Sequence, residues 1–338
     1  MKKILALVLA IGMITGLSAC SNDSSTTKTS ENSAATTAAS VDNTTKDQLY
    51  IEVSALGNLD YFYDHKLGME MVGKELGVRT EYVGPAEYDM NAMIAAFETA
   101  ISKKPNGIVV VGFEPSLDPI VKKAIDAGIP VVTVDADLPT SERIAFVGTG
   151  NFNAGKMGGE KLAELIGKTG KVAIMTKPGQ SNLEERVAGY KEALSQYPEI
   201  EIVQIVDTQS DPIIAAQAAT ALMQKYPDLV GIACVEAAGG AGSATAVKEA
   251  DAVGKVKIVA MDRGSDVIQG IEEGVISATV AQQTALMPYY AVQILYNLNN
   301  SKVAISSDNK AANVPGIPTY IDTGVIIIDM ENAQYFKR

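Results

Sequence analysis

The chain of 338 residues has no tryptophan, one histidine and two cysteines, and aromatic residues make up only 6% of it. The single histidine, His65, lies in the first helix region, so no histidine-dependent catalytic triad is expected, and one histidine does not make a histidine-rich metal site. The two cysteines are Cys20 and Cys234. Because Cys20 ends a leader segment, Cys234 has no partner for a disulfide within the mature domain and is predicted to be a small buried hydrophobic residue.

The sequence also lacks a cluster of lysines and arginines. It holds 28 basic and 40 acidic residues, for a net charge of −12. Since a basic patch is the usual footprint of nucleic-acid binding, nucleic acid is not an expected partner. Hydrophobic residues amount to 47% and charged residues to 20%, which is typical of a folded protein with a substantial core. The length permits two domains.

The N-terminus reads "MKKILALVLAIGMITGLSAC". Two lysines, an apolar stretch and small residues in that order predict a secretion signal over residues 1–19. The ending "LSAC" resembles the bacterial lipobox, which implies cleavage before Cys20 and attachment of lipid, palmitate included, to that residue. The alternative is an ordinary signal with an unrelated cysteine. The resemblance implies a protein anchored at the outer face of the bacterial cell membrane, or in the periplasm.

Residues 20–47 are rich in Ser, Thr, Asn and Ala and lack large apolar side chains. Such a segment does not bury enough surface to offset the entropy of ordering, so a disordered tether is predicted. A flexible coil of this length spans roughly 30 Å. The folded part is therefore expected to begin near residue 48.

From residue 48 onward, short runs rich in Val and Ile, such as "GIVVVG" and "PVVTVD", alternate with helical patterns. Met90, Ile94, Phe97 and Ile101 recur at the spacing of one buried helix face. The "GIP" at 128–130 predicts a helix end followed by a strand. Strands that alternate with helices indicate βαβ units and parallel sheets buried on both faces.

About ten such strands are too many for one small sheet. Small and polar residues interrupt the pattern at 148–155, and a second crossing is predicted in "TVAQQTALMPYY", which precedes the further strand "TGVIIID". We therefore predict an α/β fold of two Rossmann-like, doubly wound lobes. The first lobe comprises 48–149 plus 283–314, and the second comprises 150–282 plus 315–338.

Ligands of open α/β sheets bind beyond the carboxyl ends of the strands, and polar side chains gather at those positions. Carboxylates accept hydrogen bonds from hydroxyl groups, Arg, Asn and Gln donate them, and aromatic faces pack on the C–H faces of a sugar ring. The pattern predicts a site for a monosaccharide or small polyol. The candidate residues are Asn58, Tyr61, Phe62, Asp135, Asp137, Asn182, Arg186, Glu236, Asp262 and Gln282.

Each candidate has a structural alternative. An aspartate at a strand–helix junction is often only a helix cap or a turn residue. The aromatic residues 61–63 are alternatively core at the start of a helix. Arg186 is alternatively paired with Glu184 or Glu185 on a helix surface, and Glu236 is alternatively a solvated loop acid.

Evidence for catalysis is thin. The loop "KPGQSN" lacks the spacing of a phosphate-binding loop, and the glycine-rich 239–246 does not match the dinucleotide fingerprint in full. Paired acids such as Asp135 and Asp137 are compatible with a secreted glycosidase, but nothing in the sequence places them at a scissile bond. The protein is therefore predicted to be no enzyme and to carry no cofactor or metal.

The succession of motifs, among them "NGIVVVGFEPSLDPIVKKAIDAGIPVVTVDAD", "VGTGNFNAGKMGGEKLAE" and "KIVAMDRG", resembles the type I periplasmic sugar-binding proteins related to ribose-binding protein. The resemblance covers residues 48–330. It implies a monomeric substrate-binding protein of an ABC sugar importer, with a hinge of several crossing strands between its lobes. A monosaccharide would bind between the lobes, and an ABC transporter permease would receive it.

By position, the resemblance implies that Tyr61 and Phe62 stack on the sugar ring and that Asp135 binds its hydroxyl groups. Further ligands matched by position are Arg186, Asp262 and Gln282. Two departures, at 136–137 and 235–236, leave the identity of the sugar open. Alternative functions are a sensory protein that presents its ligand to a receptor or histidine kinase, and a binder of an amino acid or a furanosyl signal molecule.

Overall fold

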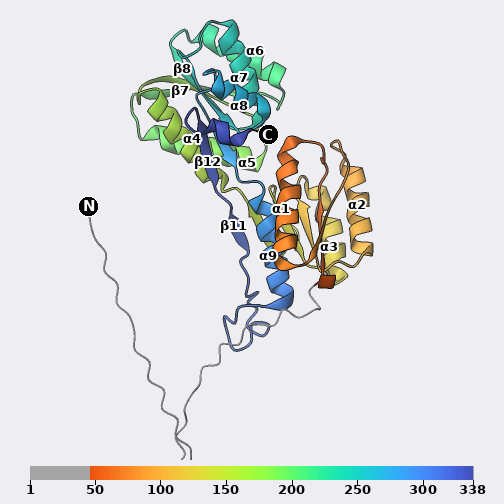
Figure 1. The fold of residues 1–338 in the computed structure, drawn as a ribbon. Coiled ribbons are helices and arrows are strands. Elements are labelled where there is room, and N and C mark those ends of the chain that lie inside the picture. Colours follow the sequence, from red (N-terminus) through yellow and green to blue (C-terminus); the bar gives the residue numbers. More distant parts are fainter. Residues whose placement is uncertain (1–45, 338) are drawn as a thin grey trace, which may run out of the picture. The chain divides into compact units, whose positions relative to one another are not determined.

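The computed structural model describes residues 46–337, in which the chain forms two six-stranded sheets flanked by helices (Figure 1). The predicted signal peptide 1–19, Cys20 and the tether up to residue 45 lie outside the described residues. The first sheet has the strand order β11-β5-β4-β3-β1-β2, with every neighbouring pair parallel. Its strands are β1 (Leu49–Val53), β2 (Arg79–Val83), β3 (Gly107–Val111), β4 (Val131–Val134), β5 (Ala145–Gly148) and β11 (Tyr320–Asp322).

The second sheet has the equivalent order β12-β10-β9-β8-β6-β7, and only β12, which lies antiparallel to β10, breaks the parallel pairing. Its strands are β6 (Gly170–Thr176), β7 (Ile200–Asp207), β8 (Leu229–Cys234), β9 (Lys257–Met261), β10 (Ala278–Gln282) and β12 (Val325–Asp329). Two parallel-dominated α/β sheets confirm the predicted fold class.

Helices connect the strands of both sheets. Those associated with the first sheet are α1 (Asp60–Leu76), α2 (Met90–Ser102), α3 (Asp118–Asp126) and α9 (Leu286–Asn300), with the 3₁₀ turn η2 (Pro115–Leu117). Those associated with the second are α4 (Asn151–Leu165), α5 (Ser181–Ser195), α6 (Pro212–Lys225), α7 (Ala237–Glu249) and α8 (Ser265–Glu272), with η3 (Ala333–Phe336). Among residues 46–337, none of these helices combines the length and apolarity needed to cross a membrane.

Strand β3 illustrates why the sheets are buried on both faces. Ile108 and Val110 belong to a core cluster with Phe97 of α2, whereas Val109 and Val111 belong to a second cluster with Leu295 of α9. Successive side chains of a strand point to opposite faces, so an unbroken apolar run supplies both cores. This confirms the prediction of sheets covered on two sides.

The chain passes between the sheets at three places. It crosses after β5 into α4, after β10 into α9, and between β11 and β12 (Figure 1). The predicted lobe boundary assigned all of 315–338 to the second lobe, but 320–322 form β11, which pairs with β5 of the first sheet. The boundary therefore lies later, near 323–324, because β11 continues the first sheet as its edge strand.

Candidate functional site

Asp135 and Asp262 occupy the same position in their respective sheets. Each follows a central strand, β4 or β9, and each adopts a left-handed backbone conformation, with φ of 63° and 66°. The N–H of Asp135 donates to Val147 O of β5 (3.1 Å), and the N–H of Asp262 donates to Val280 O of β10 (2.9 Å). Aspartate tolerates this region better than most residues. Unusual backbone conformations of this kind cluster at functional sites.

Tyr61 and Asp135 form the first-sheet part of the candidate site. The hydroxyl of Tyr61, in the first turn of α1, donates to Asp135 Oδ1 at 2.5 Å. Burial, followed by the charges of Asp135 and Asp262, raises the pKa of Tyr61 well above its ordinary value. The hydroxyl therefore keeps its proton and remains a donor at neutral pH.

Phe62 lies beneath Tyr61. It is only 3% exposed, and its ring packs edge-on against Tyr61 at 5.1 Å and against Phe113 at 5.9 Å. Phe62 therefore lies in the core at the start of α1, which is the alternative given above for the aromatic residues 61–63. Phe62 thus supports Tyr61, and Tyr61 is the member of the pair that lines the cavity described below.

Arg186 supplies the second-sheet part of the site from α5. Its side chain is buried, with Nε donating to Asn151 Oδ1 (2.9 Å) and Nη1 to Val235 O (3.0 Å), so the alternative of a surface pair with Glu184 or Glu185 is wrong. Burial raises the pKa of Asp262 more than the Arg186 guanidinium lowers it. The two groups are therefore electrostatically coupled.

Close packing of α4 on α5 fixes the backbone of Arg186. A Cβ at Gly155 of α4 would lie 2.0 Å from Arg186 O, and a Cβ at Gly189 of α5 would lie 2.1 Å from Phe152 O. Only glycine allows the two helices to approach this closely. The small residues in "NFNAGKMGGE" therefore serve to place the arginine.

Gln282, at the end of β10, connects Asp262 to one of the crossing segments. Its Nε2 donates to Asp262 Oδ1 (2.9 Å), and its Oε1 accepts from the hydroxyl of Thr149 (2.8 Å), which directly follows β5. Gln282 is 7% exposed and Thr149 is 2% exposed. The amide therefore has a fixed orientation, as a ligand-positioning group requires.

Tyr61, Asp262 and Gln282 border a cavity of about 410 Å³, whereas Asp135 and Arg186 do not line it. Its lining includes the predicted residues Asn58, Tyr61, Asp262 and Gln282, together with Asp64 and Arg263. The volume falls in the range of small-molecule sites. Carboxylates, a neutral amide and an aromatic ring around a space of this size suit a small, hydroxyl-rich ligand.

Two of the predicted acids, Asp137 and Glu236, make hydrogen bonds with other parts of the protein. Both carboxylate oxygens of Asp137 accept from the guanidinium of Arg143, at 2.5 and 2.6 Å, and Thr133 Oγ1 donates to it as well. Tertiary contacts thus hold Asp137 in an ion pair on the first sheet, and it does not line the cavity. Its neighbour Asp135 is oriented instead by Tyr61.

Glu236 caps a helix. Its carboxylate accepts from the N–H groups of Ala238 (2.8 Å) and Gly239 (2.9 Å) at the start of α7 and from Thr208 Oγ1 (2.8 Å). It is 8% exposed, so the alternative of a solvated loop acid is wrong. Asn182, the remaining candidate, is half-buried in the first turn of α5, one turn before Arg186 and on the same face.

A buried acid–base pair beneath Tyr61 escaped prediction. Glu52 of β1 and His65 of α1 are both fully buried, and His65 Nδ1 lies 2.6 Å from Glu52 Oε1. The centre of the His65 ring is 6.0 Å from the centre of the Tyr61 ring. Burial lowers the pKa of His65, but Glu52, together with the charges of Asp135 and Asp64, outweighs it, and the net shift is upward. An acid in a strand that is otherwise apolar, "LYIEV", is the sequence signal for such a pair.

Asn151, Asp64, Arg263 and Thr284 were also missed. Thr284 Oγ1 donates to Asp64 Oδ2 at 2.7 Å, and Arg263 Nη2 donates to the same oxygen. Asp64 follows Tyr61 by three residues, so the two lie on one face of α1. That spacing is a signal the sequence does offer, whereas the partners of Asp64 are visible only in the fold.

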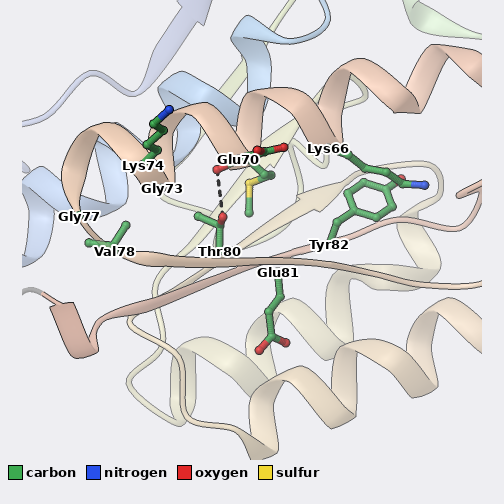
Figure 2. A pocket seen from close by; sticks show the side chains of 10 residues that line it. Lys66, Glu70, Gly73, Lys74, Gly77, Val78, Thr80, Glu81 and Tyr82 are labelled. Carbon is green, nitrogen blue, oxygen red and sulfur yellow. Dashed lines mark hydrogen bonds between the residues drawn. The ribbon is translucent and has the colours of Figure 1, made fainter.

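A second groove, of about 370 Å³, lies between α1 and the edge strand β2 (Figure 2). In Figure 2, Thr80 and Tyr82 point toward α1 and Glu81 points away, and Thr80 Oγ1 donates to Met69 O at 3.0 Å. Lys66 lies over the Tyr82 ring. The groove contains none of the predicted ligand residues. Within residues 46–337, no cluster of acidic, histidine or cysteine side chains is suited to hold a metal ion.

Comparison with known proteins identifies the fold and its family. The periplasmic binding protein domain family matches residues 53–302. The D-allose-binding periplasmic protein of Escherichia coli strain K12 is 29% identical over 259 residues, covering 73% of this chain and 83% of the relative. The ribose import binding protein RbsB of Bacillus subtilis strain 168 is 26% identical over 258 residues, covering 75% and 81%.

Among solved structures, AraP, an arabinose-binding protein from Geobacillus stearothermophilus, has a TM-score of 0.81 at 33% identity and covers 86% of this chain and 100% of its own. These relatives are substrate-binding proteins rather than enzymes, which leaves the glycosidase alternative without support. The match over most of the chain and the paired six-stranded sheets lead to one assignment. The chain belongs to the periplasmic binding protein family, among the type I sugar-binding proteins of ABC importers.

Proposed function

We propose that this protein is an extracytoplasmic, lipid-anchored binding protein that captures a monosaccharide between its two lobes and delivers it to an ABC transporter permease. The observation that carries the proposal is the convergence of Tyr61, Asp262 and Gln282 on one cavity of about 410 Å³. Asp135, held by Tyr61, adds a second carboxylate. The proposal extends to Asn58, Asn182 and Arg186 as further ligands.

The relatives guide the choice of sugar. Their names specify allose, ribose and arabinose, and another relative is the xylose/arabinose-binding protein XylF of Sulfolobus acidocaldarius. A neutral aldose with several hydroxyl groups fits two carboxylates and a neutral amide, because each hydroxyl donates to one group and accepts from another. We therefore propose a pentose or a closely related hexose, with arabinose tested first.

Sugar binding is proposed to proceed by closure of the lobes. The ligand contacts one lobe first, and contacts from the other lobe then stabilise the closed form. The crossing segments beside Thr149 and Gln282 are the proposed hinge. The closed form is the species that the permease would recognise.

Titration calorimetry of the purified protein against arabinose, ribose, xylose, allose, galactose and xylitol tests the proposal. We expect saturable binding of at least one pentose, and an affinity roughly 10- to 100-fold lower in Asp262→Asn. Asp126→Asn, a matched change at an exposed position of α3, leaves affinity unchanged. If no member of the panel binds the wild-type protein, the sugar-binding proposal fails.

The lipid anchor requires its own test. Cells that express the full chain are fed an alkyne analogue of palmitate, and the protein is then probed for the label in membrane fractions. We expect labelling of the wild-type chain and none of Cys20→Ala. Equal labelling of both proteins would contradict the assignment of Cys20.

One neighbour favours a second candidate, a sensory ligand-presenting function. XylFII, solved in a complex with LytSN, has a TM-score of 0.66 and 28% identity and covers 84% of this chain. Under this alternative the closed form is handed to a partner protein other than a permease. Crosslinking in the native cell with and without the bound sugar, followed by identification of the partner, separates the two functions.

A further inference from the structure

An ion pair joins the two sides of the cavity. Asp64 lies on α1, which packs on the first sheet, and Arg263 lies in the loop between β9 and α8 of the second sheet. Thr284, in the segment that crosses from β10 to α9, donates to the same carboxylate oxygen as Arg263. Three segments that are distant in sequence therefore meet at one carboxylate.

The pair is substantially removed from water. The side chain of Asp64 is 7% exposed and that of Arg263 is 24% exposed. A carboxylate at that depth requires a charged or hydrogen-bonding partner. Separation of the lobes would break the pair and rehydrate both groups, so its net effect is a bias toward the joined arrangement rather than a lock.

Asp64 and Arg263 each lie close in sequence to a residue of the proposed sugar site. Arg263 directly follows Asp262, and Asp64 lies one helical turn beyond Tyr61. A bond between Asp64 and Arg263 therefore fixes the second-sheet acid relative to the first-sheet tyrosine. We propose that Asp64 and Arg263 are positioning residues, which hold the two halves of the sugar site together and set its affinity without selecting among sugars.

This inference rests on the proposed sugar-binding function, and its competitor is a direct contact of either side chain with the ligand. The two differ in their effect on specificity. A positioning pair changes the affinity for every bound sugar by the same factor, because it acts on the arrangement of the lobes. A direct contact changes the order of preference, because it acts on one hydroxyl group.

The first experiment measures affinity and dissociation rate for each sugar of the panel in Asp64→Asn and Arg263→Met. We expect affinity to fall roughly 5- to 150-fold for all sugars alike, as is typical of a coupling between two states, with faster dissociation. Arg263→Lys keeps the charge and restores part of the affinity. Asp126→Asn and Arg79→Met are exposed controls and leave it unchanged. A changed order of preference, or no change, overturns the proposal.

The second experiment needs no sugar. Spin labels on Thr99→Cys of α2 and Thr245→Cys of α7, both exposed, report the distance between the lobes in a Cys20→Ser background. Cys234 is buried, and burial raises the pKa of its thiol to about 12, so it escapes labelling. We expect longer or broader distances in Asp64→Asn and Arg263→Met than in the wild type, and recovery in Arg263→Lys.

The two experiments distinguish a failure of the proposed sugar-binding function from a failure of the positioning role. If the wild-type protein binds no sugar but the label distances respond to Asp64→Asn, the proposed function fails and the pairing role stands. If sugars bind and the distances are the same in all variants, the pairing role fails and the function stands. If either neutral variant does not fold, Asp64→Glu, which keeps the charge but displaces the carboxylate, serves as the test variant.

Discussion

Asp135 and Asp262 are equivalent residues of the two sheets, each in a left-handed conformation one position beyond a central strand. The two lobes therefore carry the same chemical group on the same local turn. Their surroundings differ, because Asp135 accepts from the Tyr61 hydroxyl and Asp262 from the Gln282 amide. Because the donors differ, mutation of Tyr61 perturbs Asp135, and mutation of Gln282 perturbs Asp262.

Asp262→Asn is expected to raise stability while it weakens sugar binding. Burial raises the pKa of Asp262, so folding favours its protonated form. Stability is therefore lost as the pH rises from the ordinary pKa of 3.8 through the folded-state pKa, and the loss is complete above it. Removing that charge should raise Tm at pH 7 by a few degrees, about 1 kcal/mol. Sugar affinity should fall roughly 10- to 100-fold, because hydrogen bonds to a charged group contribute about 1.5–3 kcal/mol. Thermal melts and calorimetry measure the two effects; a lower Tm would contradict the assignment.

Tyr61→Phe should weaken sugar binding modestly, and Tyr61→Ala should weaken it strongly. The phenylalanine keeps the ring face but loses the hydroxyl that orients Asp135 at 2.5 Å. The loss of one hydrogen bond, about 1 kcal/mol, corresponds to roughly 5-fold in affinity. Calorimetry on both variants separates ring stacking from hydrogen bonding. Equal losses in the two variants would show that the ring face does not contact the sugar.

The buried pair of Glu52 and His65 should make stability depend on pH. The folded-state pKa of His65 is raised above its ordinary value of 6.5. Its contribution is therefore complete below pH 6.5 and is lost as the pH rises through the folded-state pKa. The free energy of unfolding, measured in urea between pH 5 and pH 9, is expected to decline over that window.

The matching variants test the same pair. His65→Ala leaves Glu52 buried without its partner, which typically costs about 3–5 kcal/mol. In His65→Gln, which keeps a hydrogen-bond donor but does not titrate, the decline with pH should disappear. A decline of unchanged size in His65→Gln would assign the pH dependence to another group.

Gly155→Ala should reduce both stability and sugar affinity, although residue 155 is not a predicted ligand. The new Cβ would lie 2.0 Å from Arg186 O, so α5 must shift and carry the guanidinium with it. Overpacking of this kind typically costs about 1–3 kcal/mol. Urea unfolding and calorimetry give the two values, with Glu160→Ala on the exposed side of the same helix as the control. Normal affinity in Gly155→Ala would separate Arg186 from the site.

Sequence reasoning succeeds where a residue's role follows from its place on a strand. Asp262 and Gln282 end strands whose apolar runs are visible in the sequence, and the strand-end rule brings both to the cavity. It fails for β11, whose three residues are too few to show an alternating pattern. It also gives no sign of the ion pair with Arg143 that distinguishes Asp137 from Asp135.

Buried polar groups inside regular elements are the other limit. Asp64 and His65 sit within a helix whose pattern is ordinary for an amphipathic surface helix, and Glu52 sits in a five-residue strand. The partners of Asp64 lie 199 and 220 residues away in the sequence. Glu52 and His65 are only 13 residues apart but belong to different elements, so the pattern within either element does not reveal their pairing. A polar residue at a core position signals that a partner exists, but only the fold identifies which one.

The order in which the chain visits the two sheets has a consequence for folding during synthesis. All but one strand of the second sheet come from the continuous segment 170–282, whereas the first sheet is completed by α9 and β11, which follow it. Until α9 is made, Val109 and Val132 of the first sheet lack the cover of Met287 and Leu295. The lobe that begins first therefore waits for α9 until five of the six strands of the second sheet have been made. Its apolar face, exposed in the interval, is the part of the nascent protein most prone to aggregate.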